Sequence, residues 1–189
     1  LDAIIWMAEA GEQKRVVGMV RNLSDFFRTS LNQGKDINSI KEEMLHVKSY
    51  LEIQHVRYQD ILSYDIEVPE ALYIYSIPKI TIQPLVENAL YHGIKNKRGM
   101  GHISIRGEAG EKDFTITVTD DGIGIDETRL RQVQSGIQNK VLTGKDFYGL
   151  YNVCERIRLN FGEEYGIFIE SVYGEGTNVR VILPYVEAK

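Results

Sequence analysis

Residues 83–93 read "QPLVENALYHG", and this segment constrains the fold more than any other part of the chain. Its apolar residues recur at the three- and four-residue spacing of a helix that packs on a core. The same two turns carry Glu87, Asn88 and His92. Because a helix turns by about 100° per residue, Asn88 and His92 lie on one edge, which Lys95 continues. Such an edge is either a solvated flank or part of a binding site, and the helix alone does not decide between them.

A second informative segment is "VTDDGIGID", residues 118–126, which ends a threonine-rich strand. It places the carboxylate of Asp120 before two glycines, Gly122 and Gly124, which allow positive φ and a close approach of backbone to a ligand. The segment alone is also compatible with a plain turn, since Asp-Gly is common in turns. A dinucleotide fingerprint is excluded, because Glu127 stands where the third glycine would be required.

Two further segments follow in the C-terminal third of the chain. "FYGLYNVCERI", residues 147–157, opens a helix at Gly149, and the free N–H groups of a helix N-terminus can bind phosphate. "YGEGTNVRVILP", residues 173–184, is a tight turn that leads into a final strand. Each segment is weak evidence by itself. Their order along the chain is much more specific than any one of them.

The rest of the chain falls into a helical part and an α+β part. Residues 1–58 predict two amphipathic helices in an antiparallel hairpin, which packs only on its own domain or also pairs with a second chain. Ser39 and Glu42 form a capping box at the start of the second helix. We therefore divide the chain into a hairpin, residues 1–60, and a two-layer α/β sandwich, residues 61–189. Alternating apolar residues predict its strands in segments 62–68, 102–106, 114–120, 167–172 and 178–183.

Composition places the chain among soluble globular proteins. Of its 189 residues, 43% are hydrophobic and 26% are charged, and the net charge of −5 argues weakly against nucleic acid as a partner. No segment approaches the roughly 20 apolar residues of a membrane span. The start, "LDAIIWMAEA", lacks a basic leader and an initiator Met, which indicates a piece of a longer chain and no signal peptide. Cys154, the single cysteine, excludes an internal disulfide and a multi-cysteine zinc site.

Taken in order, these segments resemble a known family. "IPKITIQPLVENALYHGI", "DDGIGI", "GLYNVCERI" and "GEGTNV" are similar to the N box, the two glycine boxes and the closing turn of the ATP-binding domain shared by gyrases, chaperones, histidine kinases and MutL, the GHKL superfamily with its Bergerat fold. The LytS-type sensor histidine kinases are the most similar members. "LSDFFRTSL" and "EEMLHVKSYLEIQHVRY" also resemble the end of their helical dimerisation and phosphotransfer region.

This resemblance implies a function for the whole chain. It would be the ATP-binding catalytic portion of a two-component sensor histidine kinase, a protein-histidine kinase that uses ATP and Mg²⁺. The full-length protein would be a homodimer with a response regulator as partner. These residues would form a cytoplasmic domain of a bacterial membrane protein, without themselves contacting the membrane or nucleic acid.

The resemblance also assigns roles around the adenine and the metal. Asn88 would be the Mg²⁺ ligand, since Mg²⁺ prefers hard oxygen donors. Asp120 would accept a hydrogen bond from the exocyclic amine of adenine, where guanine instead presents an acceptor oxygen. Gly122 and Gly124 would allow the nucleotide to approach, and Thr177 would support the adenine end.

At the phosphate end, the resemblance implies a second group of residues. His92 and Lys95 would meet phosphates, although a structural hydrogen bond is an equal alternative for His92. Residues 127–148, a short helix and a mobile loop, would form a lid. Its end would be closed by Tyr148, Gly149 and Leu150.

Two departures from the family pattern bear on the reaction. Hydrolysing members carry a general-base Glu four residues before the metal Asn, where this chain has Pro84, so a kinase is favoured over a hydrolase. Pro84 also means that the helix either begins or kinks there. Glu87 either assists phosphotransfer or pairs with an arginine. One alternative is a GHKL-type ATPase or anti-sigma-type kinase on the same fold. Because the second glycine box holds few glycines, another is a degenerate nucleotide-binding dimerisation module.

The resemblance puts the phosphoacceptor histidine on the first helix, upstream of Leu1. The histidines inside the chain stand where the family has no phosphoacceptor. We expect structural or solvated roles for His46, His55 and His102.

Overall fold

The computed structural model describes residues 1–31, 34–139 and 148–188. Its N-terminal part holds α1 (Asp2–Glu9) and α2 (Gln13–Leu31), where the sequence had suggested one helix. The helix is interrupted at Gly11, which adopts φ 75°. Glycine tolerates this left-handed conformation and commonly ends helices, so the chain stops α1 and starts α2 two residues later.

Helix α3 (Ile40–Arg57) follows the short strand β1 (Ile37–Ser39) and has the predicted capping box. The Ser39 hydroxyl accepts the N–H of Glu42 at 3.2 Å, and the Glu42 carboxylate accepts the N–H of Ser39 at 2.8 Å. The apolar residues of α3 are buried in the same hydrophobic core as those of the sheet. Helix α3 therefore packs as part of the α/β layers.

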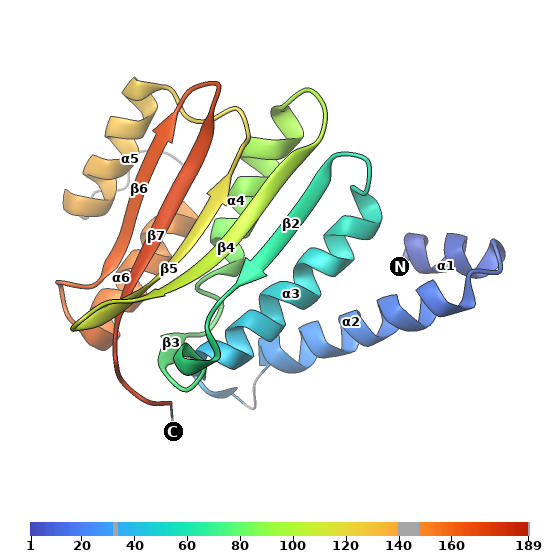
Figure 1. Ribbon diagram of the computed structural model, residues 1–189, viewed down its shortest axis with the longest axis horizontal. Helices are drawn as coiled ribbons and strands as arrows, with labels where there is room; N and C mark the ends of the chain where they lie inside the picture. The colour runs from blue at the N-terminus through green and yellow to red at the C-terminus, as the bar shows by residue number, and fades with distance from the viewer. Residues whose placement is uncertain (32–33, 140–147, 189) are drawn as a thin grey trace.

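Five strands form one mixed sheet in the order β2-β4-β5-β7-β6 (Figure 1). The β2–β4 pair is parallel and the other pairs are antiparallel. Each of these five strands overlaps a segment that alternation had predicted, whereas the short strands β1 and β3 were not predicted. The strands are β2 (Leu62–Glu67), β4 (Gly101–Ala109), β5 (Asp113–Asp120), β6 (Gly166–Val172) and β7 (Gly176–Pro184).

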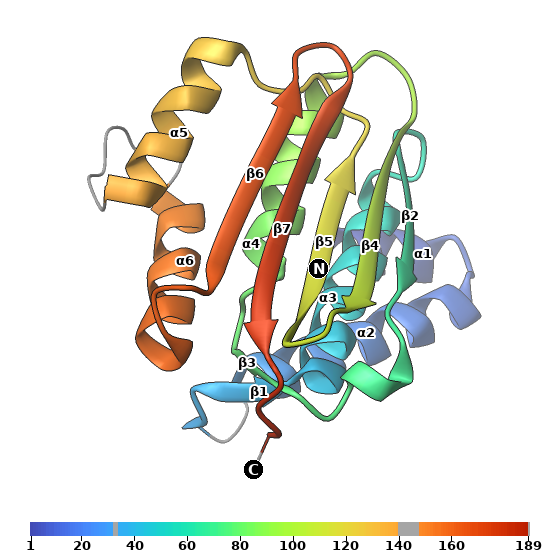
Figure 2. The same ribbon diagram turned by 60° about the vertical axis from the view of Figure 1, so that its left-hand side comes forward.

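Helices cover one face of this sheet and leave the other face open (Figures 1 and 2). On β5, Phe114, Ile116 and Val118 are at most 2% exposed and point toward the helices, whereas the intervening threonines face outward. The expected two-layer α/β sandwich is confirmed. Its helical layer consists of α3 together with α4 (Gln83–Asn88), α5 (Glu127–Asn139) and α6 (Tyr148–Phe161).

Helix α4 begins at Gln83, with Pro84 in its first turn, so the proline starts the helix and does not kink it. It does not continue as an α-helix to residue 94. After Asn88 the chain passes into a π-helical segment, Ala89–Gly93, and then a 3-10 turn, Ile94–Asn96. The short strand β3 (Ser76–Pro78) and a 3-10 turn, Glu70–Leu72, precede it.

A buried polar clamp fixes the segment that leads into α4. Glu43 of α3 is fully buried and accepts the backbone N–H groups of residues 80–82 at 3.0, 2.7 and 2.9 Å. Arg156 of α6 donates to the carbonyl oxygens of Lys79 and Ile80, both at 2.7 Å. Ile80 takes φ 56°, a strained value for a β-branched residue. The clamp holds this strained turn and thereby the start of α4.

Two smaller expectations concern Cys154 and the membrane. Cys154 is fully buried and packs in the core, where a thiol behaves as a small apolar side chain. Among the residues that the structure describes, none of the helices has the length and apolar character that crossing a membrane requires.

Candidate functional site

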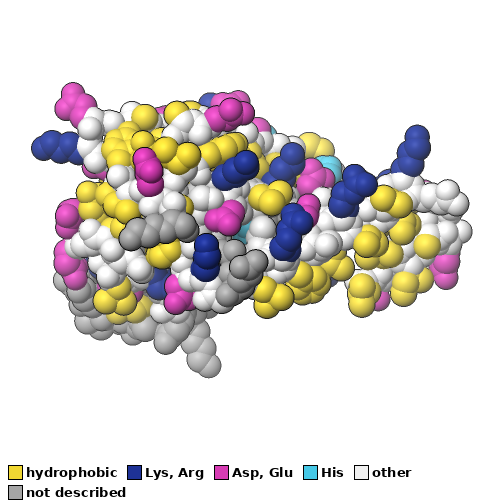
Figure 3. Space-filling model, turned by 90° about the horizontal axis from the view of Figure 1, so that it is seen from below, with side chains coloured by type: hydrophobic (Ala, Val, Ile, Leu, Met, Phe, Trp, Pro, Cys, Tyr) yellow, Lys and Arg dark blue, Asp and Glu magenta, His cyan; other side chains and the backbone are white. Residues whose placement is uncertain are grey.

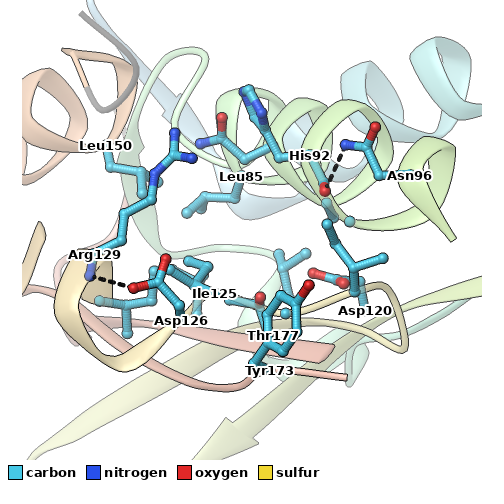
Figure 4. A pocket seen from close by; sticks show the side chains of 18 residues that line it. Leu85, His92, Asn96, Asp120, Ile125, Asp126, Arg129, Leu150, Tyr173 and Thr177 are labelled. Atoms are coloured by element: carbon cyan, nitrogen blue, oxygen red, sulfur yellow. Dashed lines mark hydrogen bonds between the residues drawn. The ribbon is translucent and has the colours of Figure 1, made fainter. Parts of the chain in front are cut away.

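A cavity of about 180 Å³ lies between the α4 region and the ends of strands β5, β6 and β7 (Figure 4). Asn88 and Asp120 both line it, although they come from different elements and are 32 positions apart in the sequence. The roles expected for these two residues on one nucleotide require that they share a cavity. The other predicted site residues that line the cavity are His92, Gly124, Leu150 and Thr177.

Asp120 is the buried acid of this cavity, with 6% of its surface exposed. It ends β5 on the face that carries the apolar residues, so its carboxylate points toward the helical layer. Burial raises the pKa of Asp120 to about 6, opposed by the hydrogen bond that the Gly122 N–H donates to Oδ1 at 2.9 Å. A carboxylate with one short protein bond and a cavity beside it retains acceptor capacity for a ligand.

Gly122 serves the site by position and does not line the cavity. A Cβ on Gly122 would lie 2.4 Å from the backbone of Gly93, so its absence lets the β5 end approach the helical segment. Gly124 does line the cavity, at φ 65°, and a Cβ there would lie 2.1 Å from the carbonyl oxygen of Val172. Both glycines are sterically required by contacts within the fold, and of the two Gly124 alone takes the positive φ that was expected; their approach to a nucleotide stays a prediction.

Thr177 lies beside Asp120, because the two residues are paired across β5 and β7. Its hydroxyl is 3.0 Å from that of Ser171. Ser171 gives its own proton to the carbonyl oxygen of Gly176 at 2.7 Å, so Thr177 is the donor between the two hydroxyls. The lone pairs of Thr177 then remain as acceptors for a ligand or a water. Ser171 is a supporting residue that the sequence analysis missed.

The π-helical segment changes which residues continue the polar edge after His92. His92 lines the cavity, but the next lining residue with a polar side chain is Asn96 and not Lys95. A π-helical turn holds more residues than an α-helical one, so a wheel drawn at 100° per residue fails beyond it. The Lys95 ammonium instead lies 5.3 Å and 4.9 Å from the ring centroids of Tyr58 and Tyr91. The expectation that Lys95 meets phosphates is therefore not supported by its position.

Glu87 is adjacent to Asn88 in the sequence but does not line the cavity. Its Oε1 accepts from Gln83 Nε2 at 2.7 Å, and Gln83 Oε1 lies 2.5 Å from Nε2 of His46. His46 is buried and its other ring nitrogen is 2.8 Å from the Thr29 hydroxyl. Glu87 thus takes part in a chain of hydrogen bonds that runs into the helical hairpin, and the suggested arginine partner is replaced by a glutamine.

The other two histidines also bond within the fold. His55 Nδ1 lies 3.0 Å from the carbonyl oxygen of Leu62. His102 lies on the open face of the sheet, between Asp65 at 2.5 Å and the Ser63 hydroxyl at 2.9 Å. These contacts agree with the structural roles that we expected.

At the far end of the cavity, Leu150 is buried and lines the wall. Gly149 does not line it, and a Cβ there would make only an ordinary contact of 3.9 Å with Pro84. Residues 140–147 of the expected lid, and the side chain of Tyr148, lie outside the described residues. The described part of the lid is α5, which is longer than the short helix that we expected.

The sequence analysis missed several polar residues of the cavity: Asn96, Asp126, Arg129 and Tyr173. For Arg129 there was a local signal. Asp126 accepts the backbone N–H of Arg129 at 3.0 Å and so caps α5, and an Asp three residues before such a position is a common helix start. For Asn96 there was also a signal, because it continues the four-residue spacing of Asn88 and His92.

Comparison with family models identifies the family of this chain. A family model described as "Histidine kinase-, DNA gyrase B-, and HSP90-like ATPase" matches residues 78–187, more than half of the chain. The chain belongs to this ATPase family. A second family model, described as "Histidine kinase", matches residues 1–62 of this chain. The expected GHKL membership is confirmed, whereas the finer LytS-type assignment stays a prediction.

Curated relatives of this GHKL-type chain are sensor histidine kinases. YesM of Bacillus subtilis (strain 168) is 34% identical over 184 residues, which cover 97% of this chain and 30% of YesM. BtsS of Escherichia coli (strain K12) is 28% identical over 167 residues, which cover 88% of this chain and 27% of BtsS. The chain therefore spans about a third or less of the length of these relatives.

Solved structures agree on the fold of the ATPase family. The histidine kinase domain of a blue-light-activated histidine kinase from Erythrobacter litoralis has a TM-score of 0.58 at 15% identity, covering 96% of this chain and 81% of that one. The catalytic domain of histidine kinase ThkA has a TM-score of 0.57 at 16% identity, covering 80% of this chain and 97% of that one. At such low identity the likeness concerns the fold alone.

Proposed function

We propose that this chain is the ATP-binding catalytic portion of a sensor histidine kinase. The single observation that carries the proposal is the convergence of Asp120 and Asn88 on one cavity. Asn88 belongs to the N box and Asp120 to the first glycine box. Leu150 of the second glycine box and Thr177 of the closing turn line the same cavity. YesM and BtsS are both named sensor histidine kinases, which supports the kinase assignment.

The base would lie at the Asp120 end of the cavity. The carboxylate can accept from the exocyclic amine of adenine, and the Thr177 hydroxyl offers acceptor lone pairs beside it. Guanine presents an oxygen where adenine has the amine, so two acceptors would face each other. ATP should therefore bind much more tightly than GTP, by the roughly 10- to 100-fold that one charge-assisted hydrogen bond supplies.

The phosphates would lie toward Asn88, which is half-buried and on the helical wall of the cavity. Its carboxamide oxygen is a hard neutral donor of the kind that Mg²⁺ accepts alongside water and phosphate oxygens. When bound, Mg²⁺ would neutralise phosphate charge and orient the transferred group. His92, on the same wall, would contact the phosphates as well.

The reaction would be an in-line transfer of the γ-phosphoryl group to a histidine that precedes Leu1 in the full-length protein. A bond from phosphorus to an imidazole nitrogen forms as the bond to the ADP oxygen breaks, and the imidazole loses its N–H proton. Pro84, at the place of the hydrolases' general base, cannot activate a water molecule. Glu87 points toward the helical hairpin and would meet the incoming imidazole from that side.

The hairpin would serve dimerisation in the full-length protein. The residues of α2 that pack on α3 include Met19 and Thr29, whereas the apolar residues on its other side are at least half exposed. Figure 3 shows them as a patch over the projecting N-terminal helices. The exposed apolar side chains of α1 and α2 are Ile5, Trp6, Val17, Val20, Phe27 and Leu31.

The division at residue 60 is proposed as the boundary between the hairpin region and the ATP-binding region along the sequence, and it does not coincide with a boundary in packing. Helix α3 would move with the catalytic domain, because Glu43 ties it to the start of α4 and its apolar side is in the common core. The partner that receives the phosphoryl group would be a response regulator, as the solved complex of ThkA with the response regulator TrrA suggests. The full-length protein would be a bacterial membrane sensor with this part in the cytoplasm.

Nucleotide titration tests the proposal. Mg-ATP should bind the chain and raise its melting temperature, and Mg-GTP should do so far more weakly. In the presence of γ-labelled ATP, this chain alone should acquire no stable label, whereas a longer protein that includes the upstream histidine should. Steady phosphate release without any acceptor would instead identify an ATPase. Absence of any ATP-dependent stabilisation would identify a degenerate module.

A further inference from the structure

The turn that precedes α4 is the one place among the described residues where a residue other than glycine takes a positive φ. Ile80 has φ 56°, a value that costs energy for a β-branched side chain. Such a conformation persists only where the surrounding structure enforces it, and residues of this kind gather at functional sites. The elements that this turn joins, and the groups that hold it, therefore indicate its role.

The strained turn determines where α4 begins. Helix α4 starts at Gln83, three residues after Ile80, and its last residue is Asn88, which lines the cavity. Asn88 is five residues from the start of the helix, or about 7.5 Å along its axis. A change in the turn at Ile80 would therefore change the position of Asn88 in the cavity.

Two charged side chains hold this turn from different helices. Glu43 of α3 accepts the backbone N–H groups of residues 80–82. Arg156 of α6 donates to the carbonyl oxygens of residues 79 and 80, both at 2.7 Å. No residue of α3, which the structure describes in full, lines the cavity, whereas α6 lines it through Leu150. Of the two side chains, Arg156 is therefore the one that connects the turn to another wall of the cavity.

Helices α4 and α6 are connected at two points. The helices α3, α4 and α6 lie side by side on the covered face of the sheet (Figures 1 and 2). At the start of α6 the backbone of Gly149 lies close to α4, since a Cβ added there would be 3.9 Å from Cβ of Pro84. Arg156, about two turns further along α6, adds its hydrogen bonds to the residues just before α4. The packing contact and the hydrogen bonds together set the relative position of the two helices.

The chemistry of the Arg156 side chain suits this connection. Arg156 is half-buried, and burial lowers its pKa, whereas the carboxylate of Glu43 acts to raise it. A guanidinium nevertheless stays protonated in proteins, and its planar fork can donate to two neighbouring acceptors at once. A lysine at this position would keep the charge but would not reproduce the two-pronged geometry.

We propose that Arg156 is a positioning residue for the metal and phosphate end of the site: by holding the strained turn at Ile80, it sets the place of Asn88 relative to α6. The inference rests on the proposed function and extends it. Arg156 does not line the cavity, so it acts through Asn88 and not on the nucleotide. Recognition of the base by Asp120, at the end of β5, should depend little on Arg156.

The test compares ligands that engage Asn88 with one that does not. Affinities for Mg-ATP, for ATP with a chelator in place of Mg²⁺, and for adenosine are measured by calorimetry on wild type and Arg156→Lys. Arg158→Lys is the matched control, because Arg158 lies on the same helix but donates to the carbonyl oxygen of Ile137 on α5, at 2.8 Å. Circular dichroism verifies that each variant is folded at the temperature of the titration.

We expect Arg156→Lys to weaken Mg-ATP binding by about 10-fold, the effect of one charge-assisted hydrogen bond, and adenosine binding by less than about 2-fold. The loss should be smaller for ATP without Mg²⁺, because Asn88 acts through the metal. Arg158→Lys should change all three affinities by the same small factor. Equal losses for Mg-ATP and adenosine in Arg156→Lys, or no loss for either, would overturn the proposal while leaving ATP binding in place. A wild-type chain that binds no Mg-ATP would instead overturn the proposed function itself.

A double variant tests whether Arg156 acts by holding the strained turn. Glycine adopts a φ near that of Ile80 without strain, so Ile80→Gly alone should bind every ligand within about 2-fold of wild type. Combined with Arg156→Lys, it should recover most of the lost Mg-ATP affinity. Should Arg156→Lys alone fail to fold, the double variant should still fold and bind Mg-ATP. A double variant that is unfolded, or that binds Mg-ATP as weakly as Arg156→Lys, would contradict the proposal.

Discussion

Glu43 and Asp120 are both buried carboxylates whose pKa is raised by burial, yet their surroundings differ. Glu43 accepts three backbone N–H groups from residues 80–82, so its oxygens are used within the protein. Asp120 accepts the N–H of Gly122, is further stabilised by the backbone N–H of Thr177, and borders a cavity with its remaining acceptor capacity. Burial alone therefore does not distinguish a structural carboxylate from a ligand-binding one. What distinguishes them is the number of hydrogen-bond donors that the protein supplies to the carboxylate.

The difference predicts opposite effects of removing the two charges. At Glu43 the carboxylate stabilises N–H groups that would be buried without a partner. At Asp120 the protein supplies too few hydrogen-bond donors to offset the cost of desolvating the carboxylate. This cost remains until a ligand provides a further donor. A carboxylate such as Asp120 lowers the stability of the fold while it allows a ligand to bind, which is a common property of functional sites.

The largest effect is expected for Glu43→Ala. The substitution leaves three buried N–H groups and Arg156 without their acceptor or counter-charge, which should reduce the free energy of unfolding by roughly 3–5 kcal/mol. For a chain of this length that corresponds to a decrease in melting temperature on the order of 10 °C. Thermal unfolding followed by circular dichroism measures it, with the exposed Glu111→Ala as control. A decrease no larger than that of the control would contradict the structural role of Glu43.

Asp120→Asn should have the next largest effect, on binding. The amide keeps the shape and an acceptor for the Gly122 N–H, but it loses the charge that strengthens the bond to the adenine amine. We expect Mg-ATP affinity to fall by about 10- to 100-fold. Calorimetric titration measures the loss, and unchanged affinity would remove Asp120 from the site.

The same variant should be more stable than wild type at neutral pH. The folded pKa of Asp120, about 6, is above its ordinary value of 3.8, so the folded state binds a proton more readily than the unfolded state between these values. The contribution of Asp120 to stability is therefore greatest below about pH 4 and is lost as the pH rises through about 6. The melting temperature of Asp120→Asn should exceed that of wild type at pH 7.5, and the difference should decline toward pH 4. A difference that is constant over this range would contradict the raised pKa.

A smaller effect is expected from pH on base recognition. A protonated Asp120 loses its charge, so adenosine affinity should be constant above pH 7 and fall by up to about 10-fold at pH 5, one unit below the pKa. Adenosine is the appropriate ligand, because the phosphates of ATP titrate in the same range. Asp120→Asn serves as the control and should show a flat profile. A flat profile for wild type would indicate that the charge of Asp120 does not contribute to recognition of the base.

Much of the fold followed from local patterns in the sequence. The strands were visible because one face of the sheet is buried and the other is open, which produces strict alternation. The same alternation extends to Asp120, in register with Phe114, Ile116 and Val118, so its inward direction was available from the sequence. The capping box of α3 was equally local.

The features that could not be predicted depend on contacts between distant segments. The clamp of Glu43 and Arg156 joins α3, α6 and the turn at Ile80, and no pattern within any one of them indicates the other two. The π-helical segment interrupts the regular winding before Lys95, which does not line the cavity, and helix winding of this kind depends on tertiary packing. Arg129 was missed because the polar sequence around it was taken for a lid without individual roles.

The smallest change in stability is expected at a third carboxylate, Asp65, on the open face of the sheet. The sign of this change distinguishes it from Asp120. Burial acts to raise the pKa of Asp65, but hydrogen bonds from His102 and Ser104 outweigh it and hold that pKa below its ordinary value. Its stabilising contribution is therefore present above pH 4 and is lost as the pH falls through the lowered pKa, which is opposite in sign to that of Asp120.

Asp65→Asn should cost less than about 1 kcal/mol at pH 7, as expected for an ion pair at the surface, and the difference from wild type should vanish in acid. Thermal unfolding of wild type, Asp65→Asn and Asp120→Asn in parallel from pH 3 to pH 7.5 measures both trends in one experiment. If the two variants shifted stability in the same direction at neutral pH, the number of protein donors around a carboxylate would not be what separates structural from binding acids in this fold.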